Sequence, residues 1–300
     1  MTSYTEDIKS VQIVFFSGTG GTKRIADEFY ENLLNRGFNV SKKNLDHFPT
    51  LKNESQLDKN TASADLVILL FAVHAFDAPE PIYEWVGETK VTNKKIAVIS
   101  VSGGGEMWPN TGCRYKCCEA LEKQGFTVIY DYMMCMPCNW VVPTNDHAAI
   151  RMLKIIPEKV NYVLDDILSG KIRRTNSKMG PVRAYITKLE KNGAKYFTKK
   201  FIISETCTGC ALCSKNCPAD NIEMKDDKPI FKDSCIMCFR CVYTCPIQAI
   251  NANNFQVLKQ GFSLTGIEKR MSGIELMPIE QCCKGIFWVG VRNYLLNKDK

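Results

Sequence analysis

The chain has 300 residues, of which 45% are hydrophobic and 24% charged, and its formal net charge is +7. This length suffices for one large and one small domain, and no apolar run approaches the roughly 20 residues of a membrane-spanning helix, so we expect no membrane span. The fifteen cysteines, together with polar residues 1–10 that lack a secretion-signal pattern, favour thiols kept reduced for metal in the cytoplasm over a secreted disulfide framework.

The first 170 residues alternate apolar runs with amphipathic stretches, which is the pattern of a parallel sheet covered by helices. Strands are expected at residues 11–16, 38–42, 66–71, 95–100 and 126–134. Helices are expected at residues 22–36 and 112–124, and at residues 147–168 with a kink at Pro157. Five strands alternating with helices predict an α/β flavodoxin-like doubly wound domain, with a five-stranded parallel sheet, over residues 1–170.

A loop rich in glycine and hydroxyl groups follows the first strand and opens the first helix. It consists of Ser17, Gly18, Thr19, Gly20, Gly21 and Thr22, and we call it the glycine-rich loop. Its backbone N–H groups, its hydroxyls and the positive end of the helix suit a phosphate dianion. It lacks the third glycine of a dinucleotide fingerprint and the Gly-Lys-Ser/Thr order of a P-loop. It resembles the phosphate loop of flavodoxins, so FMN is the predicted ligand; the alternative is a glycine-rich turn that binds nothing.

Two further loops should lie beside this one, because a doubly wound sheet binds its ligand over the carboxyl ends of its strands. The loop after the third strand supplies Ala72, His74, Phe76 and Asp77 as candidate flavin contacts. The loop after the fourth strand supplies Ser102, Gly103, Gly104, Gly105, Trp108 and Asn110. Phe76 or Trp108 is expected either to stack on the flavin ring or to pack within its own loop. His74 is expected to be a surface or hydrogen-bonded residue rather than a proton donor, and no catalytic residue is assigned.

Residues 171–200 form a basic segment with Gly180-Pro181 as a breaker. Residues 1–170 hold 17 Lys and Arg against 21 Asp and Glu, whereas residues 171–300 hold 22 against 11. Ten of these basic side chains lie in the basic segment, where Glu190 is the acidic one. We expect either a solvated basic linker helix or a docking surface for an acidic redox partner. No nucleic-acid recognition motif accompanies the charge, so no nucleic-acid partner is expected.

A duplicated cysteine motif follows the basic segment. The first run is Cys207-x2-Cys210-x2-Cys213-x3-Cys217-Pro218, and the second is Cys235-x2-Cys238-x2-Cys241-x3-Cys245-Pro246. Three closely spaced thiolates can ligate three corners of one four-iron cage, so the fourth ligand must come from elsewhere. In the two-cluster arrangement the fourth cysteine of each run ligates the other cluster. This assigns Cys207, Cys210, Cys213 and Cys245 to one [4Fe-4S] cluster, and Cys235, Cys238, Cys241 and Cys217 to the second.

The two matched runs predict a small α+β domain over residues 201–252. A segment of some fifty residues cannot bury enough apolar surface by itself, so it would fold around its metal. A zinc site would show four ligands in two pairs instead. The runs resemble the two-cluster ferredoxin module of bacteria, and all eight ligand positions match.

The combined features resemble the flavodoxin–ferredoxin fusion proteins of anaerobes. Besides the cysteine runs, the likeness includes the glycine-rich loop, the stretch at residues 102–105, and Met136-Pro137 with Asn139-Trp140. It implies FMN and two [4Fe-4S] clusters that work as a redox relay, with undefined partners.

Seven cysteines and the last segment fall outside these motifs. The cysteines are Cys113, Cys117, Cys118, Cys135, Cys138, Cys282 and Cys283. Cys135-x2-Cys138 with Cys113 or Cys117 could form a third metal site, but single cysteines are common core residues. Residues 253–300 carry no motif, and their role is not predicted.

Three functions are weighed on this basis. The first is an electron carrier that relays electrons between the clusters, FMN and low-potential redox partners, since FMN holds one or two electrons and each cluster holds one. The second is an FMN-dependent reductase that acts on a small molecule, with the clusters as its electron supply. A relay needs an exposed flavin edge, whereas a reductase needs a pocket and a positioned acid such as His74 or Asp77. The third is a scaffolding protein that has lost its flavin.

Overall fold

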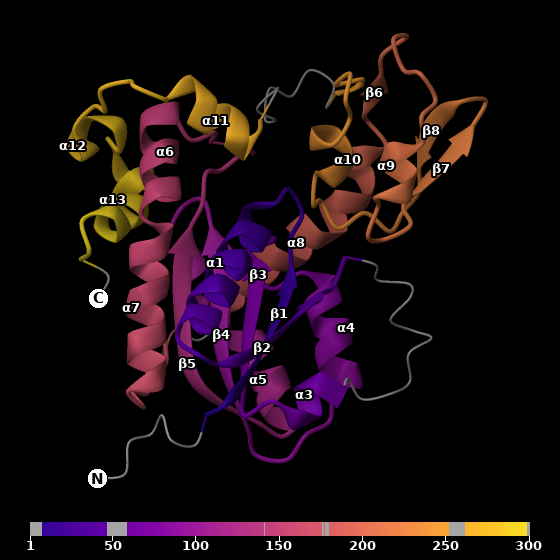
Figure 1. Cartoon of the computed structure of the whole chain (residues 1–300). Coiled ribbons are helices and arrows are strands. Elements are labelled where there is room, and N and C mark those ends of the chain that lie inside the picture. The colour runs from indigo at the N-terminus through magenta and orange to yellow at the C-terminus, as the bar shows by residue number, and fades with distance from the viewer. Residues whose placement is uncertain are drawn as a thin grey trace.

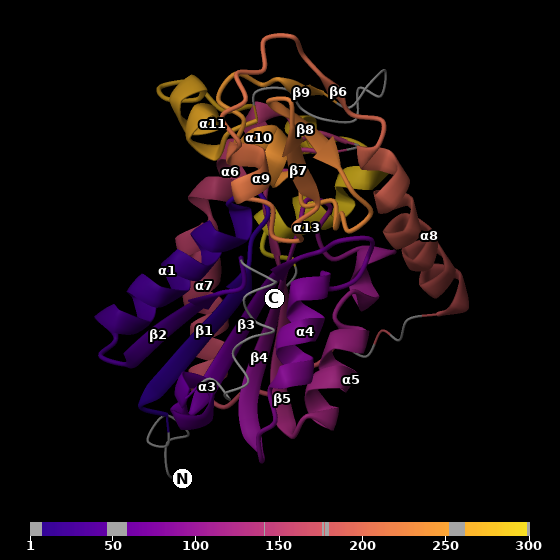
Figure 2. The same cartoon turned by 90° about the vertical axis from the view of Figure 1, so that its right-hand side faces the viewer.

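The computed structural model describes residues 8–46, 59–140, 142–175, 177, 180–251 and 262–298. Its larger part is a parallel sheet between two layers of helices, and the cysteine-rich segment lies over one end of this sheet (Figures 1 and 2). No helix in the described ranges is long and apolar enough to cross a membrane.

The large sheet has five parallel strands in the order β2-β1-β3-β4-β5. Their bounds are β1 (Ser10–Phe16), β2 (Asn39–Asn44), β3 (Leu66–Ala72), β4 (Lys94–Ser102) and β5 (Phe126–Cys135). The central strands β1 and β3 are apolar along most of their length because helices cover both faces. The strand order 2-1-3-4-5 is that of the flavodoxin-like doubly wound fold, so the predicted fold class is confirmed.

Helices cover the two faces of the sheet. On one face lie α1 (Gly21–Asn35), α6 (Asp146–Lys154) and α7 (Ile156–Leu168), and their buried side chains form one core cluster that includes Phe29. On the other face lie α4 (Glu80–Glu88) and α5 (Tyr115–Lys123), packed in a second cluster that includes Trp85. The short α3 (Lys59–Ser63) precedes β3, and a 3-10 turn, η2 (Asn110–Gly112), precedes α5.

The long kinked helix expected at residues 147–168 is two helices instead. The first, α6, ends at Lys154, and Pro157 occupies the first turn of α7. Proline is tolerated at that place because its missing N–H would have no partner within the helix. Pro157 therefore begins a helix rather than bending one.

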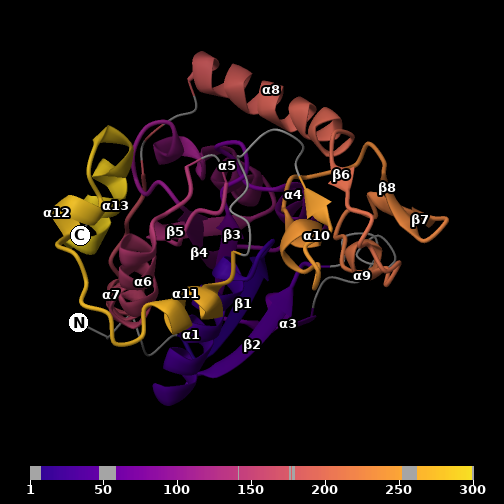
Figure 3. The same ribbon diagram turned by 90° about the horizontal axis from the view of Figure 1, so that it is seen from above.

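The basic segment contains the helix α8 (Pro181–Thr198), which begins after Gly180. It runs along the outside of the molecule and reaches the cysteine-rich segment (Figure 3). Arg183 and Thr187 are buried on its inner side. Its outer side exposes large apolar side chains, namely Val182, Tyr185, Leu189 and Tyr196.

The cysteine-rich segment is small and built from short elements. They are β6 (Ile202–Ile203), α9 (Leu212–Lys215), β7 (Ile222–Lys225), β8 (Lys228–Phe231), α10 (Arg240–Tyr243) and β9 (Ile250–Asn251). β6 pairs with β9 and β7 with β8, both antiparallel. The repeat is visible in the backbone, because α9 and α10 each follow a residue with positive φ, Ala211 at 60° and Phe239 at 57°. The expected boundary at residue 252 lies outside the described residues.

The C-terminal segment, for which the sequence predicted no structure, packs on the flavodoxin-like domain. It contains α11 (Leu264–Arg270), α12 (Ile279–Cys282), the 3-10 turn η3 (Ile286–Trp288) and α13 (Val289–Leu295). Ile267, Val291 and Tyr294 are buried in the same core cluster as α1, α6 and α7. Residues 262–298 therefore contribute buried side chains to the core of the larger domain.

Candidate functional site

The eight motif cysteines surround two small cavities. One is lined by a group that we call the far set: Cys207, Cys210, Cys213 and Cys245. The other is lined by the near set, so called because two members also line a larger cavity: Cys217, Cys235, Cys238 and Cys241. The fourth cysteine of each run thus stands beside three cysteines of the other run, which is the grouping that the repeat predicts.

These groups fit a cage of several irons better than a single ion. Thiolates that share one ion at about 2.3 Å lie close together, whereas a four-iron cage separates its ligands over four corners. Among the described residues, no group of three or more His, Cys, Asp or Glu could hold a single metal ion. Of the seven other cysteines, Cys117 and Cys135 lie in different core clusters, on opposite faces of the sheet.

The cysteines of the near set are partly buried. Burial raises the pKa of Cys238 to about 12 and raises those of Cys235 and Cys241, while the Arg240 cation opposes the shift at Cys238. Thiols are ligands only as thiolates, so the positive charge of iron would have to deprotonate this set at neutral pH.

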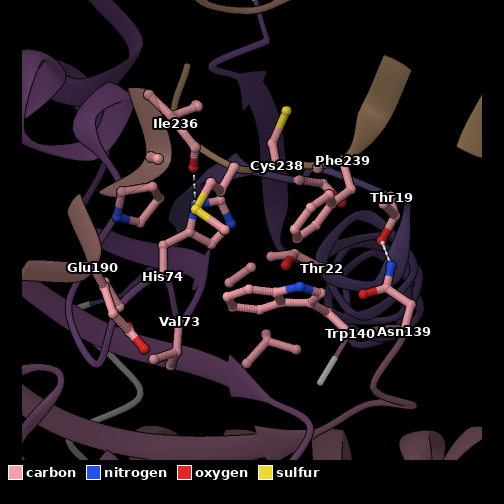
Figure 4. A pocket seen from close by; sticks show the side chains of 18 of the residues that line it. Thr19, Thr22, Val73, His74, Asn139, Trp140, Glu190, Ile236, Cys238 and Phe239 are labelled. Carbon is pink, nitrogen blue, oxygen red and sulfur yellow. Dashed lines mark hydrogen bonds between the residues drawn. The ribbon is translucent and has the colours of Figure 1, made fainter. Parts of the chain in front are cut away.

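A cavity of about 510 Å³ lies between the two domains, and Figure 4 shows part of its lining. One wall is the carboxyl edge of the sheet. The opposite wall comes from residues 233–239, which include Cys235 and Cys238, and a third comes from α8 through Glu190, Lys191, Asn192 and Ala194. Its volume falls in the range of about 300–1,000 Å³ that is usual for small-molecule sites.

Nine of the sixteen predicted flavin contacts line this interdomain cavity: Ser17, Gly18, Thr19, Gly21, Thr22, Ala72, His74, Ser102 and Gly103. The other seven do not line it: Gly20, Phe76, Asp77, Gly104, Gly105, Trp108 and Asn110. Trp108 is 64% exposed, and an added Cβ on Gly105 would lie 2.6 Å from the carbonyl carbon of Gly290 in α13. Asn110 donates from Nδ2 to Ser102 Oγ at 2.9 Å and so holds the loop after β4.

The carboxylate of Asp77 is hydrogen-bonded within the protein. Its carboxylate accepts from Tyr83 Oη at 2.6 Å, from the N–H of Ala78 at 2.9 Å and from Lys191 Nζ at 2.8 Å. Since the side chain is 3% exposed, these contacts join the loop after β3 to α8. Asp77 is thus placed to position the basic helix and not to meet a ligand.

His74 joins the two domains. Its Nδ1 lies 3.0 Å from the carbonyl oxygen of Ile236, and because that oxygen can only accept, Nδ1 carries the proton (Figure 4). Burial lowers the pKa of His74 to about 4, with Lys191 acting in the same direction. The imidazole is therefore neutral near pH 7, with Nε2 unprotonated, which makes it a poor proton donor.

The residues of the loop after β5 were not among the flavin contacts predicted from the sequence. Met136, Pro137, Cys138, Asn139 and Trp140 all line the cavity. Trp140 lies 5.3 Å from Phe239 between ring centroids, and its indole Nε1 is buried without a hydrogen-bond partner among the described residues. The carboxyl-edge rule applied to β5 would have found these residues. The cavity walls from α8 and from residues 233–239 depend on how the two domains pack, so no local sequence pattern predicts them.

The family model described as "4Fe-4S dicluster domain" matches residues 199–246. We call residues 199–246 the dicluster domain after the model that they match. The match includes all eight motif cysteines, so an iron–sulfur cofactor and a redox role follow for this part of the chain. No curated protein matches the sequence.

Solved structures resemble the part of the chain outside the dicluster domain. Two-electron reduced flavodoxin from Megasphaera elsdenii is 22% identical over 41% of this chain and 84% of that chain, with a TM-score of 0.32. Oxidised flavodoxin 2 from Bacillus cereus is 14% identical over 52% and 99%, with a TM-score of 0.36. General stress protein 14 from Treponema denticola, solved in complex with FMN, is 9% identical over 53% and 99%, with a TM-score of 0.38. Because these scores are low, the fold assignment rests on the strand order.

Proposed function

We propose that the protein transfers electrons between two [4Fe-4S] clusters in the dicluster domain and an FMN held in the interdomain cavity. The observation that carries this proposal is a shared wall: Cys238, a member of the near set, lines the same cavity as the glycine-rich loop. A Cβ added to Gly18 would lie 2.6 Å from the carbonyl oxygen of Cys238, so the two backbones are in direct contact. A cluster ligand therefore lies beside the place where the flavin would bind.

The lining residues fit FMN. The glycine-rich loop begins α1, where backbone N–H groups and the helix dipole favour a phosphate. Trp140 adds a flat apolar face to the lining, which suits the flavin ring. Bound there, FMN would supply one-electron and two-electron chemistry, while the clusters exchange single electrons.

We place the docking of an external redox protein on the basic segment. The inner side of α8 is fixed by Lys191 and Asp77, whereas its outer side exposes Lys188 together with Tyr185 and Leu189. A basic surface with apolar side chains suits an acidic partner, and thiols kept reduced for metal suit the cytoplasm.

The enclosed cavity supports a second candidate, an FMN-dependent reductase that acts on a small molecule. Glu190 lines the cavity, and burial raises its pKa, so it is the better-placed acid now that Asp77 is bound to Lys191. Rapid multiple turnover of small electron acceptors by wild-type protein, slowed in Glu190→Gln, would favour this reductase. Single turnover only would favour the relay.

The proposed relay is tested by cofactor content and by stepwise reduction. Protein purified without oxygen should contain about eight irons and eight sulfides per chain and one FMN. During stepwise addition of dithionite, absorbance changes of the flavin and the clusters should be linked, with electrons redistributing between them after each addition. An iron content far below eight, or flavin and cluster signals that never exchange electrons, would sink the proposal.

Trp140→Ala tests the flavin site itself. It removes the flat indole face from the cavity wall, so the Kd for FMN should rise about 2- to 12-fold, the worth of one aromatic pair of about 0.5–1.5 kcal/mol. Fluorescence quenching of FMN added to flavin-free protein measures this change. Trp108→Ala is the matched control, because Trp108 is exposed and lies outside the cavity, and it should leave the Kd unchanged.

A further inference from the structure

The two halves of the dicluster domain are built alike, but their short helices carry a cation at different positions, Lys215 in α9 and Arg240 in α10. In each run, one short helix carries the third cysteine, and this helix starts at Leu212 in α9 and at Arg240 in α10. Both residues directly precede the third cysteine of their run. The repeat therefore places a cation in the near half where the far half has an apolar side chain that is 39% exposed.

Arg240 lies between the near set and the glycine-rich loop. Its Nη2 donates to the carbonyl oxygen of Ser17 at 2.5 Å, and its Nε donates to that of Gly18 at 3.2 Å. Its Nη1 reaches the carbonyl oxygen of Asn216, the residue before Cys217, at 3.4 Å. The guanidinium is thus fixed by backbone on both sides of the interface.

The charge of Arg240 is only partly compensated. Its carboxylate partner is Asp46, at 2.5 Å from Nη2. The Asp46 side chain is 29% exposed against 11% for Arg240, so water screens the anion more than the cation. Arg240 directly precedes Cys241 and is bonded to the residue before Cys217, so its charge lies close to two members of the near set.

We propose that Arg240 makes the two clusters unequal, by raising the reduction potential of the cluster held by the near set above that of the cluster held by the far set. A fixed cation stabilises an added electron, since reduction makes the cluster more negative. With both clusters bound, a reduced far cluster would give one electron to an oxidised near cluster, and no bond or proton would move. An electron supplied by a low-potential one-electron donor would then come to rest beside the interdomain cavity. Arg240 is a positioning residue, and the inference rests on the proposed function only for what receives the electron next.

Stepwise reduction of the full chain, followed by the EPR signals of the reduced clusters, tests this inference. Wild-type protein should show two separate one-electron steps. Arg240→Met should move only the step at higher potential, downward, so that the preference of the electron for the near cluster falls at least threefold, or about 28 mV at 59 mV per tenfold change. Lys215→Met removes an exposed cation from α9 in the far half and should leave both steps in place.

A second variant keeps the test decisive if Arg240→Met fails to assemble its clusters. Asp46→Asn removes the counter-charge, leaves the guanidinium, and should move the upper step upward. Coincident steps in wild-type protein, a shift of the lower step in Arg240→Met, or a fall or no change in Asp46→Asn would overturn the inference. The measurement is repeated on chain freed of flavin, so the cluster result stands even where the flavin proposal fails.

Discussion

His74 is the clearest case of a side chain whose place in the fold sets its chemistry. It comes from the loop after β3, yet its hydrogen-bond partner, the carbonyl of Ile236, lies 162 positions further along the chain. Burial at this contact lowers the pKa of the imidazole to about 4 from an ordinary 6.5. The fold therefore holds the neutral form over a pH range in which an unfolded chain would be protonated.

This shift predicts a pH dependence of stability. Between about pH 6.5 and pH 4, His74 is protonated in the unfolded chain but stays neutral in the folded protein. Because the unfolded chain binds the extra proton, the free energy of unfolding falls as the pH falls. The full loss amounts to about 3 kcal/mol, of which about 2 kcal/mol is reached at pH 5. His74→Gln cannot titrate, so its thermal midpoint should fall by several degrees less than that of wild type between pH 7 and pH 5. Equal falls in the two proteins would contradict the assignment.

At the scale of elements, the backbone of the glycine-rich loop packs directly on the backbone of the cysteine-bearing loop at Gly18 and Cys238. Gly18 has no room for a side chain, because an added Cβ would lie 2.6 Å from the carbonyl oxygen of Cys238. Gly21, three residues later, has room: an added Cβ would lie 3.5 Å from Cε of Met136, an ordinary contact. Of these two glycines in one loop, only Gly21 leaves space for a side chain.

The two glycines form a matched pair of variants. Gly18→Ala should force the domains apart locally and cost about 1–3 kcal/mol, the usual price of overpacking. Gly21→Ala should be neutral or stabilise by up to about 1 kcal/mol, since alanine favours the helix that begins there. Loss of cluster absorbance on heating measures both. A Gly18→Ala protein as stable as Gly21→Ala would show that the domains are not in contact here.

The elements also show what the sequence could predict. Continuous apolar runs predicted β3 and β4, because strands buried on both faces need no polar residues, and the cysteine spacing predicted how the two runs cross. Asp77 was predicted as a ligand contact because it lies near the right edge, but Lys191, 114 positions away, pairs with it. The cavity wall from α8 depends on such long-range packing and has no signature in its own residues.

At the scale of the whole molecule, the C-terminal segment completes the larger domain. Its helices are short and their apolar residues are scattered. Neither the period of an amphipathic helix nor that of a half-buried strand therefore marks them in the sequence. They are stabilised by contacts with β5 and α7. Tyr294 Oη donates to Met134 Sδ at 3.6 Å, and Lys159 Nζ lies 4.2 Å from the centre of the Tyr294 ring. Segments of this kind are recognised only once the rest of the fold is present.

Tyr294→Ala measures this contribution. The side chain is 2% exposed, and its removal should lower the free energy of unfolding by about 3–5 kcal/mol, as for other large aromatic residues in cores. Phe287→Ala is the control within the same segment, because Phe287 is 71% exposed, and its effect should stay within about 0.5 kcal/mol. Similar losses in the two variants would mean that the segment does not dock as described.

The contact between Gly18 and Cys238 also bears on how the mature protein is made. Small metal-binding domains fold around their metal, so insertion of iron is the step that shuts this wall of the cavity. Chains stripped of iron should therefore lose affinity for FMN. An iron-free chain that binds FMN as tightly as the iron-loaded chain would show that this wall forms without its metal.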